Sequence, residues 1–401
     1  MWNLKTTETI LHYKSNMYSG PAMKVGAGVI GGDAYEVAAA AGYRLIGGEC
    51  GSVGIAGGFS QGGGHSLLTS AYGMGADQVL EWEVVTADGK HLTASPEKNS
   101  DLYWALSGGG AGTYAVVLSM TVKMHKDGPV SGGTLSFAST NPDDYWTAVS
   151  LWMQKAPALV AKNNTFLLVI QNYRFTVAAM TLPGQPASAV NTLLSPFFQD
   201  LDRLNISYQL STSYSENYLD HFNSSLGPLP YGNQPSTTTL MSRLIPKSVA
   251  ADANKTSTFV DTLRFIVADG TFLVGCLLFD ASHAVHPDNA VLPAWRDAIG
   301  GCNLNAFWNF TAPLASNLGV KRNMVDTYVP ALEKATPGGA VYMNEMDPWY
   351  AGDWKTNLYG KNYDRLRGIK KRYDPSHLLW GKFTVGSDES QVDGAGRLCR
   401  V

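Results

Sequence analysis

The sequence predicts an α+β protein with a mostly antiparallel sheet, and three observations support this. Strand-like runs joined by hairpins alternate with helical runs between about residues 131 and 338. Before them stand two glycine-rich loops, each next to predicted strands, at residues 47–66 and 107–112. The length of 401 residues, with 45% apolar and 16% charged residues, is typical of a globular protein with room for two full-sized cores.

The composition excludes several classes of partner. A net charge of −3 without a cluster of Lys and Arg argues against nucleic acid as the main partner. No apolar run approaches the roughly 18 residues needed to cross a membrane, and the first residues lack the order of a signal peptide. We therefore expect a small-molecule substrate, while the oligomeric state stays open.

Glycosylation sequons and cysteines bear on the compartment. Sequons are a weak sign of secretion, because chance also produces some in a chain rich in Ser, Thr and Asn. They stand at Asn163, Asn205, Asn223, Asn254 and Asn309. The four cysteines are too few for a disulfide scaffold, but Cys276 and Cys302 can pair if adjacent strands bring them together.

The first part of the chain reads as strands around one helix. A strand at 21–29 precedes a helix at 32–42, which Gly42 ends, and a strand at 43–48 follows. Further strands are predicted at 79–86 and 91–94, joined by a turn at Asp88 and Gly89. A short helix at 101–106 and a strand at 114–124 enclose the second glycine loop.

The first glycine loop, GGECGSVGIAGGFSQGGGHS, predicts a ligand-binding loop. Backbone without side chains allows N–H groups to approach an anionic or planar ligand closely. The alternative is a flexible linker, but linkers rarely carry buried-type residues such as Val53, Ile55 and Phe59. The two loops together suggest one extended ligand held from two sides. Neither loop has the Rossmann arrangement, and no Walker A lysine is present.

The middle of the chain predicts a separate layer of helices and strands. Helices are expected at 142–156, 186–202 and 248–261, and strands at 165–173, 175–182, 207–212 and 270–280. A hairpin joins the first two of these strands at residues 172–175. Most of the many aromatic residues here belong to a core, and a few are expected to line a pocket for an aromatic or terpenoid-like substrate.

Polar and aromatic residues gather after residue 342. Tyr342, Asn344 and Glu345 are predicted in a strand, with Tyr342 and Asn344 on one face and Glu345 on the other. Such a tyrosine–amide pair can orient a ligand or take a proton, and the alternative is an ordinary polar surface strand. A helix is expected at 362–373, ended by the pair Asp374 and Pro375.

Three stretches together resemble the berberine-bridge-enzyme branch of the vanillyl-alcohol-oxidase family, the flavoproteins with a PCMH-type FAD-binding domain. They are the first glycine loop followed by YGMGADQVLEWEVVTADG, the segment DLYWALSGGGAGTYAVV, and YMNE with YGKNYDRL, IKKRYDPSHLL and VGSDE near the end. They cover about the first 130 and last 60 residues in the family's order. The fungal members are most similar.

The resemblance implies an FAD-linked oxidase of a small secondary-metabolite or sugar-like substrate. It divides the chain into the C-terminal part of an FAD-binding domain at 1–130, a substrate domain at 131–338, and a berberine-bridge-type segment at 339–401 that packs back on the FAD domain. The implied catalytic residues are Tyr342, Asn344 and Glu345, with Tyr342 as base or orienting group. The implied cofactor-binding residues are Cys50, Ser52, Val53, Gly54, Gly57, Gly58, Gly62, Gly63, Gly64, His65, Asn362 and Tyr363. No metal site is expected.

Cysteine chemistry and the N-terminal side of the family pattern carry further expectations. Cys50 matches the cysteine that many members link to the flavin through a thioether, whereas His65 belongs to a different motif from the histidine that makes a second link. Members carry that histidine and a first FAD subdomain ahead of the point where this sequence begins. We therefore expect an incomplete FAD domain with FAD bound or lost, and Cys399 without its partner. The alternatives to an oxidase are a flavin-free isomerase or cyclase and a non-catalytic ligand-binding remnant.

Overall fold

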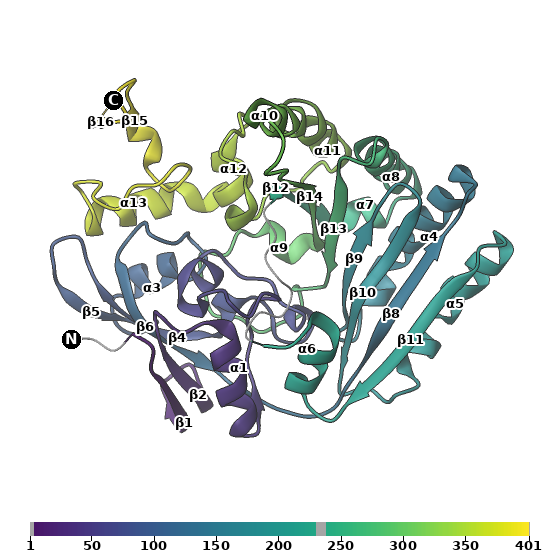
Figure 1. Ribbon diagram of the computed structural model, residues 1–401. Helices are drawn as coiled ribbons and strands as arrows, with labels where there is room; N and C mark the ends of the chain where they lie inside the picture. The colour runs from purple at the N-terminus through teal and green to yellow at the C-terminus, as the bar shows by residue number, and fades with distance from the viewer. Residues whose placement is uncertain (1–3, 230–237, 401) are drawn as a thin grey trace.

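A computed structural model describes residues 4–229 and 238–400, which form two large antiparallel sheets and two small two-stranded ones (Figure 1). The first sheet has five strands in the order β1-β2-β6-β4-β5, and every neighbouring pair is antiparallel. Its strands are β1 (Thr7–Lys14), β2 (Ser19–Gly26), β4 (Val79–Val85), β5 (His91–Ala94) and β6 (Val116–Lys123). This sheet carries both glycine loops on the connections between its strands.

Local turn signals fix the elements around the first sheet. Helix α1 (Gly31–Ala40) stops before Gly42, whose φ of 81° lies in the left-handed region that glycine favours. The hairpin between β4 and β5 turns through Gly89, which also has a positive φ of 80°. The predicted helix before the second glycine loop is α3 (Ser100–Leu106). The short strands β3 (Tyr43–Arg44) and β7 (His125–Lys126) pair with each other.

The second sheet has seven strands in the order β11-β8-β10-β9-β13-β14-β12. They are β8 (Val130–Ala138), β9 (Thr165–Ile170), β10 (Arg174–Pro183), β11 (Tyr208–Ser215), β12 (Thr238–Pro246), β13 (Leu273–Leu278) and β14 (Ala298–Phe307). The predicted hairpin at residues 172–175 is confirmed, because β9 and β10 pair there in antiparallel register. The predicted α+β class with antiparallel sheets is confirmed as well.

Helices α4 (Pro142–Val160), α5 (Ala189–Arg203) and α8 (Ala253–Val267) cover one face of the second sheet (Figure 1). The indole of Trp152 on α4 contacts the rings of Phe166, Phe175 and Phe197, so α4, α5 and two strands share one aromatic core. The single helix predicted at 248–261 is wrong. The chain forms α7 (Lys247–Ala250) and then α8, because the side chain of Asp252 accepts hydrogen bonds from the first backbone N–H groups of a new helix.

The structure settles whether Cys276 and Cys302 pair, which the sequence left open. The two residues are direct partners across β13 and β14, with Cα atoms 4.0 Å apart, and they form a disulfide. Cys50 and Cys399 are free, and Cys399 is exposed.

The remaining helices connect the two sheets and bring the end of the chain back to the first. They are α2 (Thr69–Tyr72), α6 (Tyr218–Leu226), α9 (Ala294–Asp297), α10 (Leu314–Asn323), α11 (Val329–Ala335), α12 (Trp354–Tyr359) and α13 (Tyr363–Tyr373), with the small hairpin β15 (Ser390–Val392) and β16 (Leu398–Arg400). Helix α13 packs against α3 and ends before Asp374, as predicted. The buried Lys370 on α13 donates to the carbonyl of Thr113 beside the second glycine loop. No helix in the two described stretches is both long and apolar enough to cross a membrane.

Candidate active site

The two glycine loops are joined directly. Residues Ile55–Phe59 form one helical turn in the first loop, and the chain then runs on towards Gly63 and Gly64, which have φ values of 111° and 74°. The backbone N–H of Gly110 in the second loop donates to the carbonyl of Gln61 in the first, with 2.9 Å between the atoms. The two loops are therefore neighbours in space, and that they hold one ligand stays a prediction.

The segment Tyr342–Glu345 lies on the first glycine loop. The amide nitrogen of Asn344 donates to the carbonyl of Gly58 at 2.8 Å and to the hydroxyl of Tyr342 at 2.6 Å. A side chain at Gly62 would approach within 2.7 Å of the same amide nitrogen. Missing side chains at Gly58 and Gly62 therefore make room for Asn344.

The strand predicted at Tyr342–Glu345 is wrong. Met343–Glu345 form a short 3₁₀ turn, in which the N–H of Glu345 donates to the carbonyl of Tyr342. The period of two that placed Glu345 on the opposite face does not apply to a turn. As a result, Tyr342 and Glu345 line the same pocket.

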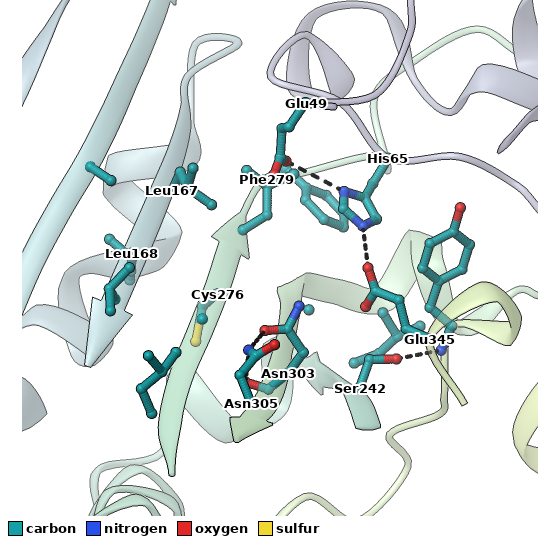
Figure 2. A pocket seen from close by; sticks show the side chains of 18 of the residues that line it. Glu49, His65, Leu167, Leu168, Ser242, Cys276, Phe279, Asn303, Asn305 and Glu345 are labelled. Carbon is teal, nitrogen blue, oxygen red and sulfur yellow. Dashed lines mark hydrogen bonds and ion pairs between the residues drawn. The ribbon is translucent and has the colours of Figure 1, made fainter. Parts of the chain in front are cut away.

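This pocket has a volume of about 340 Å³ and lies between the first glycine loop, the Tyr342–Glu345 turn and the second sheet (Figure 2). Its size falls in the range of small-molecule sites. Aliphatic and aromatic side chains from several elements form most of the wall, among them Leu167, Leu277, Phe279 and Trp295. Polar side chains enter from three segments, and they include Glu49, His65, Ser242, Asn303, Asn305 and Glu345.

Glu49, His65 and Glu345 form an array across one wall of the pocket. Figure 2 shows the two carboxylates on opposite sides of the imidazole ring. Nε2 of His65 lies 3.2 Å from Oε1 of Glu345, and Nδ1 lies 3.7 Å from Oε1 of Glu49. The side chains are largely buried, with exposed fractions of 20% for His65 and Glu345 and 13% for Glu49. Nδ1 and the facing oxygen of Glu49 are buried atoms without a hydrogen-bond partner among the described residues.

The charges of the array perturb its own pKa values. Burial raises the pKa of Glu49, and the carboxylate of Glu345 adds to this, whereas His65 lowers it in part. Burial alone lowers the pKa of His65, but the hydrogen bond and charge of Glu345 and the charge of Glu49 outweigh it, so the pKa is raised. The array therefore favours states that hold extra protons.

Two neighbouring groups have raised pKa values for the same reasons. Burial and the charge of Glu345 raise the pKa of the Tyr342 phenol, despite its hydrogen bond from Asn344. This is the opposite of what a phenol base requires. Burial, Glu49 and Glu345 together raise the pKa of the half-buried Cys50 thiol to about 11.

The other residues implied by the resemblance fall into two groups. Ser52, Val53, Gly54, Gly57 and Gly63 lie in the first glycine loop with Cys50, and the side chain of Val53 is 40% exposed. Asn362 and Tyr363 do not line the pocket. Asn362 donates to the carbonyl of Ala290, and the hydroxyl of Tyr363 donates to Asp388 at 2.6 Å.

Sequence reasoning missed Glu49 and the two asparagines of β14. Glu49 directly precedes Cys50, so its position in the glycine loop was a signal that was available. Asn303 and Asn305 alternate along a strand and therefore share a face, and the amide of Asn305 donates to the carbonyl oxygen of the Asn303 side chain. A polar pair on an otherwise apolar strand was also a detectable sign of a pocket.

The fold and the site together define an enzyme scaffold whose glycine loops and second sheet enclose one pocket, and comparisons with known proteins agree. A family profile described as "FAD binding domain" matches residues 10–95, and one described as "Berberine and berberine like" matches residues 341–382. The bifunctional decalin synthase calF of Penicillium decumbens is 47% identical over 403 residues, which span 100% of this chain and 70% of that protein. The VAO-type flavoprotein oxidase VAO615 of Thermothelomyces thermophilus is 45% identical over 404 residues, again 100% of this chain and 70% of the relative.

Solved structures give the same result. The VAO-type flavoprotein MtVAO615 of Myceliophthora thermophila superimposes with a TM-score of 0.95 at 44% identity, and the match covers 100% of this chain and 73% of that one. A carbohydrate oxidase of Microdochium nivale shares the fold, with a TM-score of 0.75 at 20% identity over 91% of this chain and 78% of that one. The chain belongs to the berberine-bridge-enzyme-like, VAO-type family of FAD-dependent oxidoreductases.

The glycine loops fit the FAD that this family implies. A Cβ atom added at Gly54, Gly57 or Gly112 would meet no atom within 4 Å, so bare backbone of both loops borders open space. Gly112 has a φ of 64°, which allows the second loop to turn there without a side chain. Such backbone suits a planar ring system and a pyrophosphate, because N–H groups can approach them closely. The free Cys50 lies in the same loop as Gly54 and Gly57.

Proposed function

We propose that this protein is an FAD-linked oxidase of a small organic substrate, either a secondary metabolite or a sugar-like molecule. The observation that carries the proposal is the convergence of three segments on one pocket: the first glycine loop, the Tyr342–Glu345 turn and the second sheet. FAD, when bound, would accept hydride from the substrate carbon and pass the electrons to O₂. The glycine loops would hold it, and Cys50 would be its covalent anchor.

The chain's own residues would position the substrate and move its proton. Tyr342 accepts a hydrogen bond from Asn344 and keeps its own proton, because its pKa is raised. It is therefore suited to donate a hydrogen bond to a substrate oxygen and to orient it. Glu345 is an acidic group on the same pocket, and most of the other residues that line this pocket are apolar.

A cyclase or isomerase on the same scaffold is the second candidate. The relative named as a bifunctional decalin synthase is 47% identical to this chain, so a ring-forming reaction is compatible with this degree of similarity. The acid–base groups of Glu49, His65 and Glu345 in a largely apolar pocket suit such chemistry. A ligand-binding protein without catalysis is the third possibility and is an outcome of the same test.

The visible spectrum of the purified protein tests the proposal. We expect flavin absorption that stays with the acid-precipitated protein, and O₂ consumption with an oxidisable substrate. A Cys50→Ala variant should release the flavin on precipitation, and colour that stays in the pellet would show that Cys50 is not the link. A colourless native protein would refute the oxidase. Turnover of a polyene without O₂ consumption would favour the cyclase, and no turnover the binding protein.

We also propose a division of the chain at residues 130 and 338, with 339–401 as a segment that covers the FAD domain. The two separate sheets and the contacts of α13 with α3 support this division. Limited proteolysis should cut first near these two positions.

Entry into the secretory pathway is a further proposal. Four of the sequons have an exposed asparagine, so each could carry an N-linked glycan: Asn163, Asn205, Asn254 and Asn309. Digestion of protein from a fungal host with an N-glycosidase should lower its mass, and an unchanged mass would refute the proposal.

A further inference from the structure

The imidazole ring of His65 contacts two carboxylates. Each ring nitrogen faces one carboxylate oxygen, Nε2 at 3.2 Å from Glu345 and Nδ1 at 3.7 Å from Glu49. A carboxylate oxygen and a ring nitrogen without its proton are both acceptors, so either contact is repulsive unless a proton lies in it. The geometry thus requires two protons for the three groups, and the array then carries a net charge of −1.

The contact with Glu49 is the weaker one. At 3.7 Å it is longer than a hydrogen bond, and both of its atoms are buried without another partner among the described residues. A buried acceptor without a partner is costly, and a small shift of either side chain would close the gap. The contact with Glu345 is already within hydrogen-bond distance, so it sets the orientation of the ring.

We propose that Glu49, His65 and Glu345 form one proton-exchanging unit, in which Glu345 is the catalytic base and His65 and Glu49 are positioning residues. His65 makes its hydrogen bond with Oε1 of Glu345. The other carboxylate oxygen of Glu345 has no hydrogen-bond partner in the described part of the chain. This role rests on the proposed function, because it needs a substrate that loses a proton in the pocket.

For an alcohol substrate the atoms and electrons balance as follows. The substrate C–H bond would break, and FAD, when bound as in the proposed function, would be the acceptor of its hydride. The O–H bond of the hydroxyl group on the same carbon would break, and its proton would move to the second oxygen of Glu345 while the C=O bond forms. His65 keeps its proton towards Glu345 and holds that carboxylate in place, and Glu49 keeps the ring in the required protonation state.

The charge of the unit also restricts the substrate class. No Lys or Arg occurs among the described residues that line the pocket, so nothing there offsets two carboxylates except one imidazolium. We therefore expect neutral hydroxyl compounds and not carboxylates or phosphates. The Asn303 and Asn305 amides at another part of the wall can bind a polar group on an otherwise apolar substrate.

Titration of His65 by nitrogen NMR tests the unit without any substrate. With ¹⁵N-labelled histidine, signals lost in His65→Gln identify this ring. We expect it to titrate above pH 6.5, the ordinary pKa for histidine. The groups that face it are Glu49, Glu345 and the phenol of Tyr342, with the Cys50 thiol next to Glu49.

Glu49→Gln and Glu345→Gln should each lower the His65 pKa, because each removes a negative charge. His91→Gln is the matched control, since His91 makes a comparable contact with Glu83 at 2.9 Å on the first sheet. It should leave the titration of His65 unchanged. A His65 that titrates at or below pH 6.5, or that ignores Glu49→Gln, would overturn the unit.

Kinetics then test proton exchange with the substrate, using neutral alcohols as probes. Glu345→Gln should lower kcat by about 10²–10⁴-fold, the range for a lost general base, with a much smaller change in KM. Glu49→Gln should move the pH inflection of kcat that follows His65 to lower pH. An alcohol should be preferred at least tenfold in kcat/KM over the same skeleton with an added carboxylate. A wild-type kcat in Glu345→Gln would overturn the assignment of Glu345 as the base. A wild-type protein without flavin or turnover would overturn the proposed function, and the titration of His65 would then decide whether the three residues form one unit.

Discussion

Substitution of Gly62 by alanine tests how the Tyr342–Glu345 turn packs on the first glycine loop. A Cβ atom there would lie 2.7 Å from the carbonyl oxygen of Gly58 and 2.7 Å from the amide nitrogen of Asn344. The amide can rotate away, but it then loses its 2.8 Å hydrogen bond to Gly58. The carbonyl is backbone and cannot move alone. The substitution therefore disturbs both the loop and the contact that holds Asn344.

The expected cost is the sum of two effects. Overpacking of a tight site costs about 1–3 kcal/mol, and loss of one hydrogen bond costs about 1 kcal/mol. We expect Gly62→Ala to lower the free energy of unfolding by about 2–4 kcal/mol on these grounds. Urea unfolding followed by tryptophan fluorescence measures this change.

Gly54→Ala is the matched control in the same loop. The backbone of Gly54 has φ −66° and ψ 115°, which any residue adopts, and a Cβ atom there meets nothing within 4 Å. We expect its free energy of unfolding to stay within about 1 kcal/mol of the wild type or to rise slightly. If Gly62→Ala destabilised the protein no more than Gly54→Ala, the reasoning about the seat of Asn344 would be refuted. Gly54→Ala should nevertheless weaken flavin retention, because the proposed cradle needs that open space.

Three other predictions concern stability and reactivity. Replacing Cys276 and Cys302 by serine should lower the free energy of unfolding by about 3.5 kcal/mol, because the disulfide closes a loop of 26 residues and so restricts the unfolded chain. A change below about 1 kcal/mol in urea unfolding would contradict this. Asp374→Asn should lower the free energy of unfolding by about 3–5 kcal/mol, because it leaves the buried ammonium of Lys370 without the carboxylate that lies 2.6 Å away. A variant as stable as the wild type in urea would show that the ion pair is dispensable. In protein without flavin, Cys50 should react with a thiol reagent slowly at pH 7 and faster as the pH rises to about 11, because burial and the nearby carboxylates raise its pKa to about 11. Rapid labelling at pH 7 would show that the thiol pKa is not raised.

Local signals predicted most of the fold. The turn at Gly89 and the stop at Gly42 depend on backbone conformations that glycine favours, so they can be read from a few neighbouring residues. The pairing of Cys276 with Cys302 stayed open, because it depends on β14 lying beside β13, and no strand was predicted around Cys302. The split of the helix at Asp252 was missed because a capping aspartate was read as an ordinary helical residue.

The site was harder to predict, because its contacts join distant parts of the chain. Asn344 bonds to Gly58 across 286 positions, and His65 bonds to Glu345 across 280 positions. No local pattern reports such contacts, so the alternation of Tyr342, Asn344 and Glu345 was interpreted as a strand. The long-range contact with the glycine loop holds these residues in a turn instead.

The same negative charges decide the roles of Tyr342 and His65 in opposite ways. Glu345 and Glu49 raise the pKa of the phenol, so Tyr342 retains its proton and is a hydrogen-bond donor. They also raise the pKa of the imidazole, so His65 retains its proton and binds Glu345. Glu345 contacts His65 through one oxygen and has a second oxygen without a partner among the described residues, whereas the facing oxygen of Glu49 is a buried atom. A proton leaving the substrate is therefore best received by Glu345, with Tyr342 orienting the substrate oxygen.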